Sequence, residues 1–255
     1  MNVLSVVSAK GGVGKSTVAA NLSVALHELG HPVLAIDLDP QNGLRFHFSF
    51  EAGAGPGLAH ADSSSFERLI EATPSGVALL AYGECDEARR RAFESRLAQD
   101  RSWLANRLES LDLPDEAVVV LDTPPGPSAY MTQALTAASL ALAVVLPDAG
   151  SYVTLPQMRS LFESYCIGRP GFQDYGFVVN QIDQSRMLSR DVASMLRASF
   201  GERVVGRIHQ DQAISEALAF GQSVLQYAPH SEGAQDVRSC ARWISERLST
   251  IGAGQ

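Results

Sequence analysis

The segment AKGGVGKST, residues 9–17, limits most strongly what this chain of 255 residues can fold into. It follows the apolar run VLSVVS (3–8) and precedes a pattern that predicts an amphipathic helix from Ser16 to about Leu29. A glycine-rich turn between a buried strand and a helix is typical of phosphate-binding loops, whose general pattern is GxxxxGK followed by Ser or Thr. Gly14, Lys15 and Ser16 fit this pattern, whereas Ala9 stands at the position of its first glycine.

This loop predicts contacts with the phosphates of a nucleotide. Backbone N–H groups can turn toward phosphate oxygens where side chains are absent or small, and a helix N-terminus adds partial positive charge. Lys15 is expected to reach the β- and γ-phosphates, Ser16 to ligate Mg²⁺, and Thr17 to touch the α-phosphate. The alternative is a glycine-rich turn with a fortuitous lysine. The residues expected to offer backbone N–H groups are Gly11, Gly12, Val13 and Gly14.

The same segment holds both lysines of the chain, Lys10 and Lys15, while every other strong base is an arginine. A compact ammonium fits among backbone amides better than a planar guanidinium does. We therefore expect both lysines to contact phosphate groups.

The rest of the chain alternates predicted strands with predicted helices. Runs without alternation of polarity, such as VVVLD, are typical of buried parallel strands. The pattern predicts an α/β fold: a doubly wound, mostly parallel sheet with helices on both faces, in a single domain over residues 1–255. The further strands are expected at 33–37, 78–82, 118–122, 140–146, 175–180 and 204–208.

The connecting segments carry more specific expectations. Residues 51–65 are expected to form a surface loop, with Ser63 to Ser65 as a helix cap. Residues 86–111 predict one long helix, on which Arg89 to Arg91 form a solvated face. The last helix, about 232–248, is expected to dock on the sheet through Trp243, Ile244 and Leu248.

Three carboxylates follow two of the predicted strands. Asp37 and Asp39 lie in DLDPQN (37–42), and Asp122 lies in LDTPPG (121–126). The carboxyl ends of adjacent parallel strands converge on a ligand crevice, which favours a metal–nucleotide site there. Taken alone, Asp37 or Asp39 could instead be a turn residue before Pro40.

Composition narrows the possible partners and compartment. The net charge of −8 and the pI near 5.2 argue against a general nucleic-acid-binding surface. Three well-separated cysteines indicate a reducing compartment without disulfides. The apolar run of about 13 residues from Ala134 is too short to cross a bilayer, which needs about 20. We expect a cytosolic protein, or one that is held at a membrane only through partners.

The loop KGGVGKS resembles the deviant Walker A motif of the ParA/MinD family of dimeric ATPases. The resemblance implies ATP and Mg²⁺ as ligands and a homodimer that sandwiches two ATP molecules. It implies that Lys10 reaches the partner's phosphates, that Asp39 polarises the attacking water, and that Asp37 and Asp122 hold Mg²⁺ through its outer shell. The family's order DPQGN is changed here, because Asn42 precedes Gly43.

The resemblance extends to the base-binding end of the family's site. Asn180, at the end of FVVN, stands where the family places the residue that reads adenine, although it could also be a simple strand-end cap. The segment 206–224 matches the one that closes over the base, which adds Ile208 and Asp211 to the expected contacts.

The long segments beginning at Asp122 and Arg207 are most similar to the branch of this family that takes part in bacterial cellulose biosynthesis. That branch implies a slow ATPase switch whose partners are cytosolic components of the cellulose synthase and secretion complex, together with a small companion protein. Two alternatives stay open: a DNA-partitioning or pole-positioning ATPase, and a nucleotide-held scaffold with negligible hydrolysis. The nitrogenase-type iron proteins are excluded, because no cysteine follows Asp122 in DTPPGPSAYMTQAL.

Overall fold

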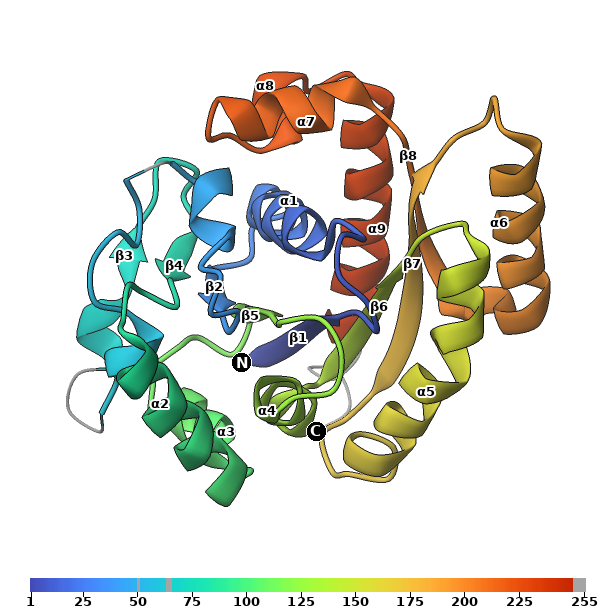
Figure 1. Ribbon diagram of the computed structural model, residues 1–255. Helices are drawn as coiled ribbons and strands as arrows, with labels where there is room; N and C mark the ends of the chain where they lie inside the picture. Colours follow the sequence, from blue (N-terminus) through green and yellow to red (C-terminus); the bar gives the residue numbers. More distant parts are fainter. Residues whose placement is uncertain (50, 63–65, 250–255) are drawn as a thin grey trace.

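The computed structural model describes residues 1–49, 51–62 and 66–249. Within them, eight strands form one sheet in the order β3-β4-β2-β5-β1-β6-β7-β8, with helices on both faces (Figure 1). The strands are β1 (Asn2–Val7), β2 (Val33–Asp37), β3 (Glu71–Ala72), β4 (Ala78–Leu80), β5 (Val118–Asp122), β6 (Leu140–Val145), β7 (Asp174–Ile182) and β8 (Val204–His209).

The sheet is parallel except at one edge, where the two-residue strand β3 runs antiparallel to β4. The sequence did not predict β3, because a two-residue strand leaves no periodic signal. The doubly wound, mostly parallel sheet is confirmed. Strands β2, β5 and β6 are buried along their whole length, which explains their continuous apolar sequences.

Helices α1, α7, α8 and α9 cover one face of the sheet, and α2 to α6 cover the other (Figure 1). The helices are α1 (Lys15–Glu28), α2 (Glu87–Gln99), α3 (Trp103–Glu109), α4 (Ala129–Ala137), α5 (Ala149–Tyr165), α6 (Met187–Phe200), α7 (Gln212–Ala219), α8 (Val224–Tyr227) and α9 (Glu232–Ser249).

The single helix expected over 86–111 is wrong, because the chain turns between α2 and α3. The turn is stabilised by Gln133 of α4, which is fully buried. Its Oε1 accepts the Leu104 N–H at 2.9 Å, and its Nε2 donates to the Leu97 carbonyl at 2.9 Å and to the Asp100 carbonyl. One side chain thus pairs backbone groups that a continuous helix would have paired internally.

Other expectations about surface and core are met. Arg90 and Arg91 pair with Glu87 on the exposed face of α2, so the solvated face is confirmed. Ile244 and Leu248 are buried where α9 packs against α1 and β8, which confirms the docked last helix. The expected cap at Ser63 to Ser65 lies outside the described residues. Among the described residues, every helix is too short or too polar to span a bilayer.

Replacing Gln133 with Met approximately keeps its volume but leaves the Leu104 N–H and the Leu97 carbonyl without partners, while the Asp100 carbonyl keeps the Trp103 N–H. Each buried unpaired group costs about 1–3 kcal/mol, so we expect the free energy of unfolding to fall by about 3 kcal/mol. Urea denaturation measures this loss. The control Gln99→Met, at an exposed position on α2, should change stability by less than about 0.5 kcal/mol. Equal effects of the two substitutions would contradict the role of Gln133.

Candidate functional site

The glycine-rich loop between β1 and α1 forms a backbone cradle at the N-terminus of a helix. Gly12 and Gly14 have φ of 75° and 79°, which a residue with a side chain rarely adopts. Where residues with positive φ alternate with residues of negative φ, successive backbone N–H groups point to the same side and form a concavity that binds anions. Gly14 is the N-cap of α1, and in this fully described helix no side chain caps the first turn. The free N–H groups and the helix dipole therefore suit a phosphate chain.

The end of β7 lies directly against this cradle. Asn180 is 5% exposed, and its Nδ2 donates to the Val13 carbonyl at 2.8 Å. A Cβ at Gly14 would overlap the Asn180 amide, so Gly14 is required for this close approach as well as for its φ. Asn180 thus connects the end of β7 to the glycine-rich loop that follows β1. The predicted contact of Asn180 with adenine stays a prediction.

A buried ion pair connects the loop to the end of β5. The Lys15 Nζ lies 2.5 Å from the Asp122 Oδ1, and both side chains are almost completely buried. The other carboxylate oxygen of Asp122, Oδ2, is buried and has no hydrogen-bond partner among the described residues. Buried polar atoms are nearly always paired, so this oxygen fits a ligand such as a cation or its bound water.

Asp37 brings a second carboxylate to the same place. Asp37 and Asp122 are register partners on β2 and β5, and both are fully buried. Burial and the charge of Asp122 raise the pKa of the Asp37 carboxyl well above its usual value. Two buried carboxylates beside one lysine leave an excess of negative charge that a divalent cation would offset, so these residues fit Mg²⁺.

Asp37 also shapes the segment that follows β2. Its two oxygens accept the N–H groups of Asp39 at 2.9 Å and Leu44 at 3.0 Å. Asp39 is half-buried, and its Oδ1 accepts the Gln41 N–H at 2.9 Å. Because backbone donors occupy Asp37, contact with a cation through water suits it better than direct ligation. The roles of Asp37 and Asp39 toward Mg²⁺ and water stay predictions.

The changed order of Asn42 and Gly43 has a structural explanation. Asn42 adopts a left-handed φ of 51°, which Asn tolerates better than most residues. Its buried side chain donates to the Gly53 carbonyl at 3.2 Å and accepts the Gly83 N–H at 3.3 Å. Asn42 therefore ties the segment after β2 to two other loops.

Lys10 points away from its own glycine cradle. Its Nζ lies 2.8 Å from both oxygens of Asp148, the N-cap residue of α5, which also accepts the Ser151 N–H at 2.6 Å. The Lys10 side chain is 33% exposed. Asp148 could not be predicted as the partner of Lys10, because 138 residues separate the two in sequence. A contact of Lys10 with a partner's phosphates stays a prediction.

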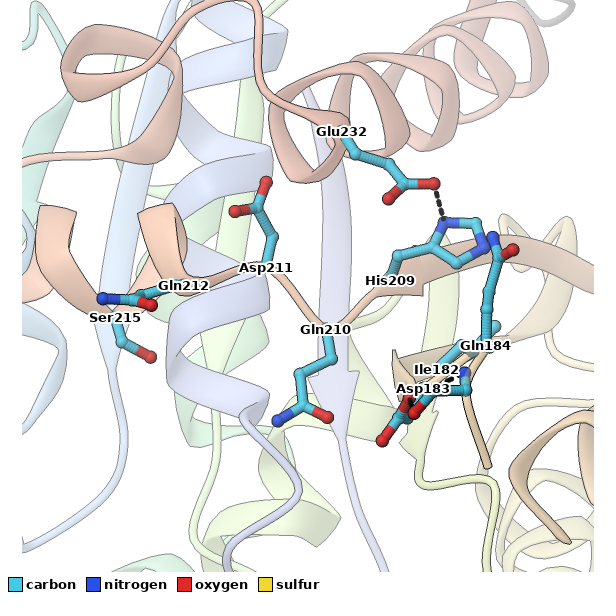
Figure 2. A pocket seen from close by; sticks show the side chains of 10 residues that line it. Ile182, Asp183, Gln184, His209, Gln210, Asp211, Gln212, Ser215 and Glu232 are labelled. Atoms are coloured by element: carbon cyan, nitrogen blue, oxygen red, sulfur yellow. Dashed lines mark hydrogen bonds and ion pairs between the residues drawn. The ribbon is translucent and has the colours of Figure 1, made fainter. Parts of the chain in front are cut away.

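A pocket of about 730 Å³ lies at the ends of β7 and β8 (Figure 2). His209 lies in it between two carboxylates, with its Nδ1 2.9 Å from Asp236 and 3.3 Å from Glu232. Asp211 lines the pocket, but its oxygens cap α7 and α9 by accepting the N–H groups of Ala213 and Gly233. Gln184 and Glu232 also line the pocket, and no motif in the sequence predicts a role for either residue.

Ile208 is 1% exposed and belongs to the core on the α1 side of the sheet. Ile208 does not line the pocket, and the predicted contacts of Ile208 and Asp211 with a base stay predictions.

A buried histidine that the sequence did not reveal lies beside the helix α1. His47 ends the short 3-10 helix Leu44–His47, and its Nε2 lies 3.5 Å from the Thr17 hydroxyl. Burial lowers the pKa of His47 to about 4. The imidazole is therefore neutral in the fold at pH 7, next to a residue expected to contact the α-phosphate.

A parallel sheet with a lysine-bearing glycine loop at a helix N-terminus, and carboxylates on the neighbouring strand ends, defines a P-loop ATPase of the ParA/MinD type. MinD from Pyrococcus horikoshii, solved with Mg-ADP, superimposes with a TM-score of 0.76 at 24% identity, covering 100% of this chain and 99% of that one. Loop and carboxylates thus lie in a fold shared with that structure.

The chain belongs to the family described as cellulose biosynthesis protein BcsQ, whose family model matches residues 1–244. BcsQ from Escherichia coli K12 is 24% identical, covering 95% of this chain and 94% of its own. The chromosome-partitioning ATPase Soj from Thermus thermophilus is 32% identical, and the match covers 94% of this chain and 93% of Soj. The expected family resemblance is confirmed, although Soj is more similar in sequence than this BcsQ.

Substitutions at Asn42 separate its backbone conformation from its hydrogen bonds. Asn42→Gly keeps the left-handed conformation and loses two hydrogen bonds, so we expect a loss of about 1–2 kcal/mol in the free energy of unfolding. Asn42→Ala adds the cost of a Cβ at positive φ, about 1 kcal/mol more. Chemical denaturation of both variants measures which of them is more stable, and we expect it to be Asn42→Gly. A more stable Ala variant would contradict the left-handed conformation.

The buried neutral His47 predicts a pH-dependent stability. Because the pKa is about 4 in the fold and about 6.5 in the unfolded chain, the unfolded state takes up a proton first as the pH falls. The contribution of His47 to the free energy of unfolding is therefore complete above about pH 6.5. It decreases by about 3 kcal/mol as the pH falls from about 6.5 to about 4. The difference in the free energy of unfolding between wild type and His47→Gln should therefore become smaller as the pH falls. A difference constant with pH would contradict a buried neutral imidazole.

Proposed function

We propose that this chain binds Mg-ATP and acts as an ATP-dependent dimerising switch in bacterial cellulose biosynthesis. The observation that carries the proposal is the different placement of the two lysines. Lys15 is buried in the cradle against Asp122, whereas Lys10 lies outside it, partly exposed, against Asp148. An ammonium held at the rim of the site by one carboxylate is available to the phosphates of a second subunit.

The residues of the cradle have distinct roles in this proposal. The loop N–H groups and Lys15 bind the phosphate chain, Ser16 and Asp122 hold Mg²⁺, and Thr17 contacts the α-phosphate. When bound, Mg²⁺ would neutralise charge on the β- and γ-phosphates. Support for these ligands comes from the P. horikoshii MinD, which was solved with Mg-ADP.

Asp39 orients the water that attacks the γ-phosphate, and the backbone contact with Asp37 positions Asp39 for this step. Slow hydrolysis then reopens the dimer. The segment after Asp122 transmits the change to a partner, since the Gly126 N–H donates to the Ser8 carbonyl at the start of the loop.

The cellulose pathway is supported by the family match over residues 1–244. The proposed partners are cytosolic components of the cellulose synthase and secretion complex and a small companion protein. The protein would work in the cytoplasm and reach the inner membrane or a cell pole through them. The test is cellulose production by the source strain after removal of the gene, with restoration by wild type but not by Lys15→Ala.

A DNA-partitioning ATPase is the second candidate, because Soj is 32% identical over nearly the whole chain. This function requires ATP-dependent DNA binding that weakens steeply with salt. A flat DNA titration at low salt with Mg-ATP would exclude it. A nucleotide-held scaffold is the third candidate, and unchanged ATP turnover in Asp39→Ala would favour it.

Light scattering of the wild type with Mg-ATP should give about twice the 27.3 kDa mass of one chain, whereas Mg-ADP and no nucleotide should give one chain. Lys10→Ala should bind nucleotide with similar affinity but stay at one chain, because its own cradle is intact. The control Arg101→Ala, at an exposed position between α2 and α3, should behave like wild type. If the mass of the wild type did not change with nucleotide, the proposed switch function would be wrong and the scaffold function would be favoured.

A further inference from the structure

We propose that a second anion site lies between α6 and β8 and binds the phosphate group of a small phosphorylated molecule. A pocket of about 280 Å³ is present there, and three arginines line it: Arg190, Arg197 and Arg207. Gln184 and Ser194 add two polar side chains to its wall. The pocket is separate from the glycine cradle, which belongs to β1 and α1.

The arginines converge from two elements. Arg190, Ser194 and Arg197 are spaced by four and three residues, so they form one stripe along α6. Arg207 comes from β8, the edge strand of the described sheet, and faces the stripe across the pocket. Arg197 and Arg207 also line a neighbouring pocket on the α9 side of β8, whose carboxylate, Asp236, lies 2.9 Å from His209.

The positive charge of the pocket is not neutralised by the protein. No acidic residue lines the pocket, and within the described chain these three arginines form no ion pair. Among the described residues, the Arg190 guanidinium donates only to the Gln184 carbonyl, at 2.9 Å. By contrast, Arg186 at the start of α6 pairs with Asp183 at 3.0 Å, and Arg203 before β8 pairs with Asp174 at 2.7 Å.

This contrast points to an external anion. Three guanidinium groups close together repel one another, and an acidic chain with a net charge of −8 has carboxylates available to relieve that repulsion. Neighbouring arginines use such carboxylates, whereas Asp191 on α6 and Glu202 before β8 lie outside the pocket lining.

The charge and the volume select the ligand class. A phosphate monoester carries about −1.5 to −2 charges and three acceptor oxygens, which suits several arginines better than a single carboxylate does. The pocket volume of about 280 Å³ lies just below the usual range of ligand pockets, about 300–1,000 Å³. A small phosphorylated metabolite therefore fits better than a nucleotide with its base.

Isothermal titration calorimetry at constant ionic strength tests the site, with glucose 1-phosphate and inorganic phosphate as probes. Excess Mg-ADP is present so that the glycine cradle is occupied. A repeat of the titration with Lys15→Ala shows whether binding of the probes depends on that cradle. We expect one saturable site in both proteins, and at least a tenfold loss of affinity in Arg197→Ala/Arg207→Ala. The charge-matched control Arg101→Ala/Arg159→Ala removes two exposed arginines elsewhere and should bind like wild type.

Saturable binding of either probe with this arginine dependence supports the site, and the preferred probe distinguishes an esterified from a free phosphate. Absence of saturable binding, or equal loss in both double variants, overturns the proposal. Loss of binding in Lys15→Ala would assign the phosphate to the glycine cradle. Salt-sensitive duplex DNA binding with the same arginine dependence, without binding of the small probes, would make this edge a nucleic-acid surface instead. Thermal melting of each variant verifies that its fold is intact.

Discussion

The buried ion pair between Lys15 and Asp122 is the interaction on which the rest of the site depends. Taking two charges out of water is costly, and removing one partner of such a pair leaves an unpaired buried charge at a cost of about 3–5 kcal/mol. The pair therefore connects the start of α1 firmly to the end of β5. Asp37 adds a carboxylate beside it, and the backbone bonds of Asp37 define the path of the chain after β2.

Several features of the fold and site could be predicted because they are local in sequence. Strand VLSVVS, the glycine loop and the helix after it are contiguous, and the carboxylates follow buried runs directly. The order of strands and helices then requires parallel pairing, which brings Asp37 and Asp122 into register. Family resemblance followed from the same contiguous motifs.

The features that could not be predicted depend on distant side chains. The break between α2 and α3 depends on Gln133, some thirty residues away, and the apolar stripe of 86–111 is compatible with either arrangement. Similarly, the partner of Lys10 lies at the N-terminus of α5, far away in sequence. The neutral state of His47 results from its burial in the fold, which the residues next to it in sequence do not determine. The arginine pocket between α6 and β8 required knowledge of which strand forms the edge.

Gln133 has a mechanical consequence for the segment after Asp122. Helix α4 begins seven residues after that carboxylate, and Gln133 lies in its middle. Because one amide is bonded to both sides of the α2–α3 corner, Gln133 connects α4 directly to this corner. A displacement of α4 along the sheet would carry α2 and α3 with it, so a small shift at the end of β5 would become a movement of the outer surface of the protein (Figure 1).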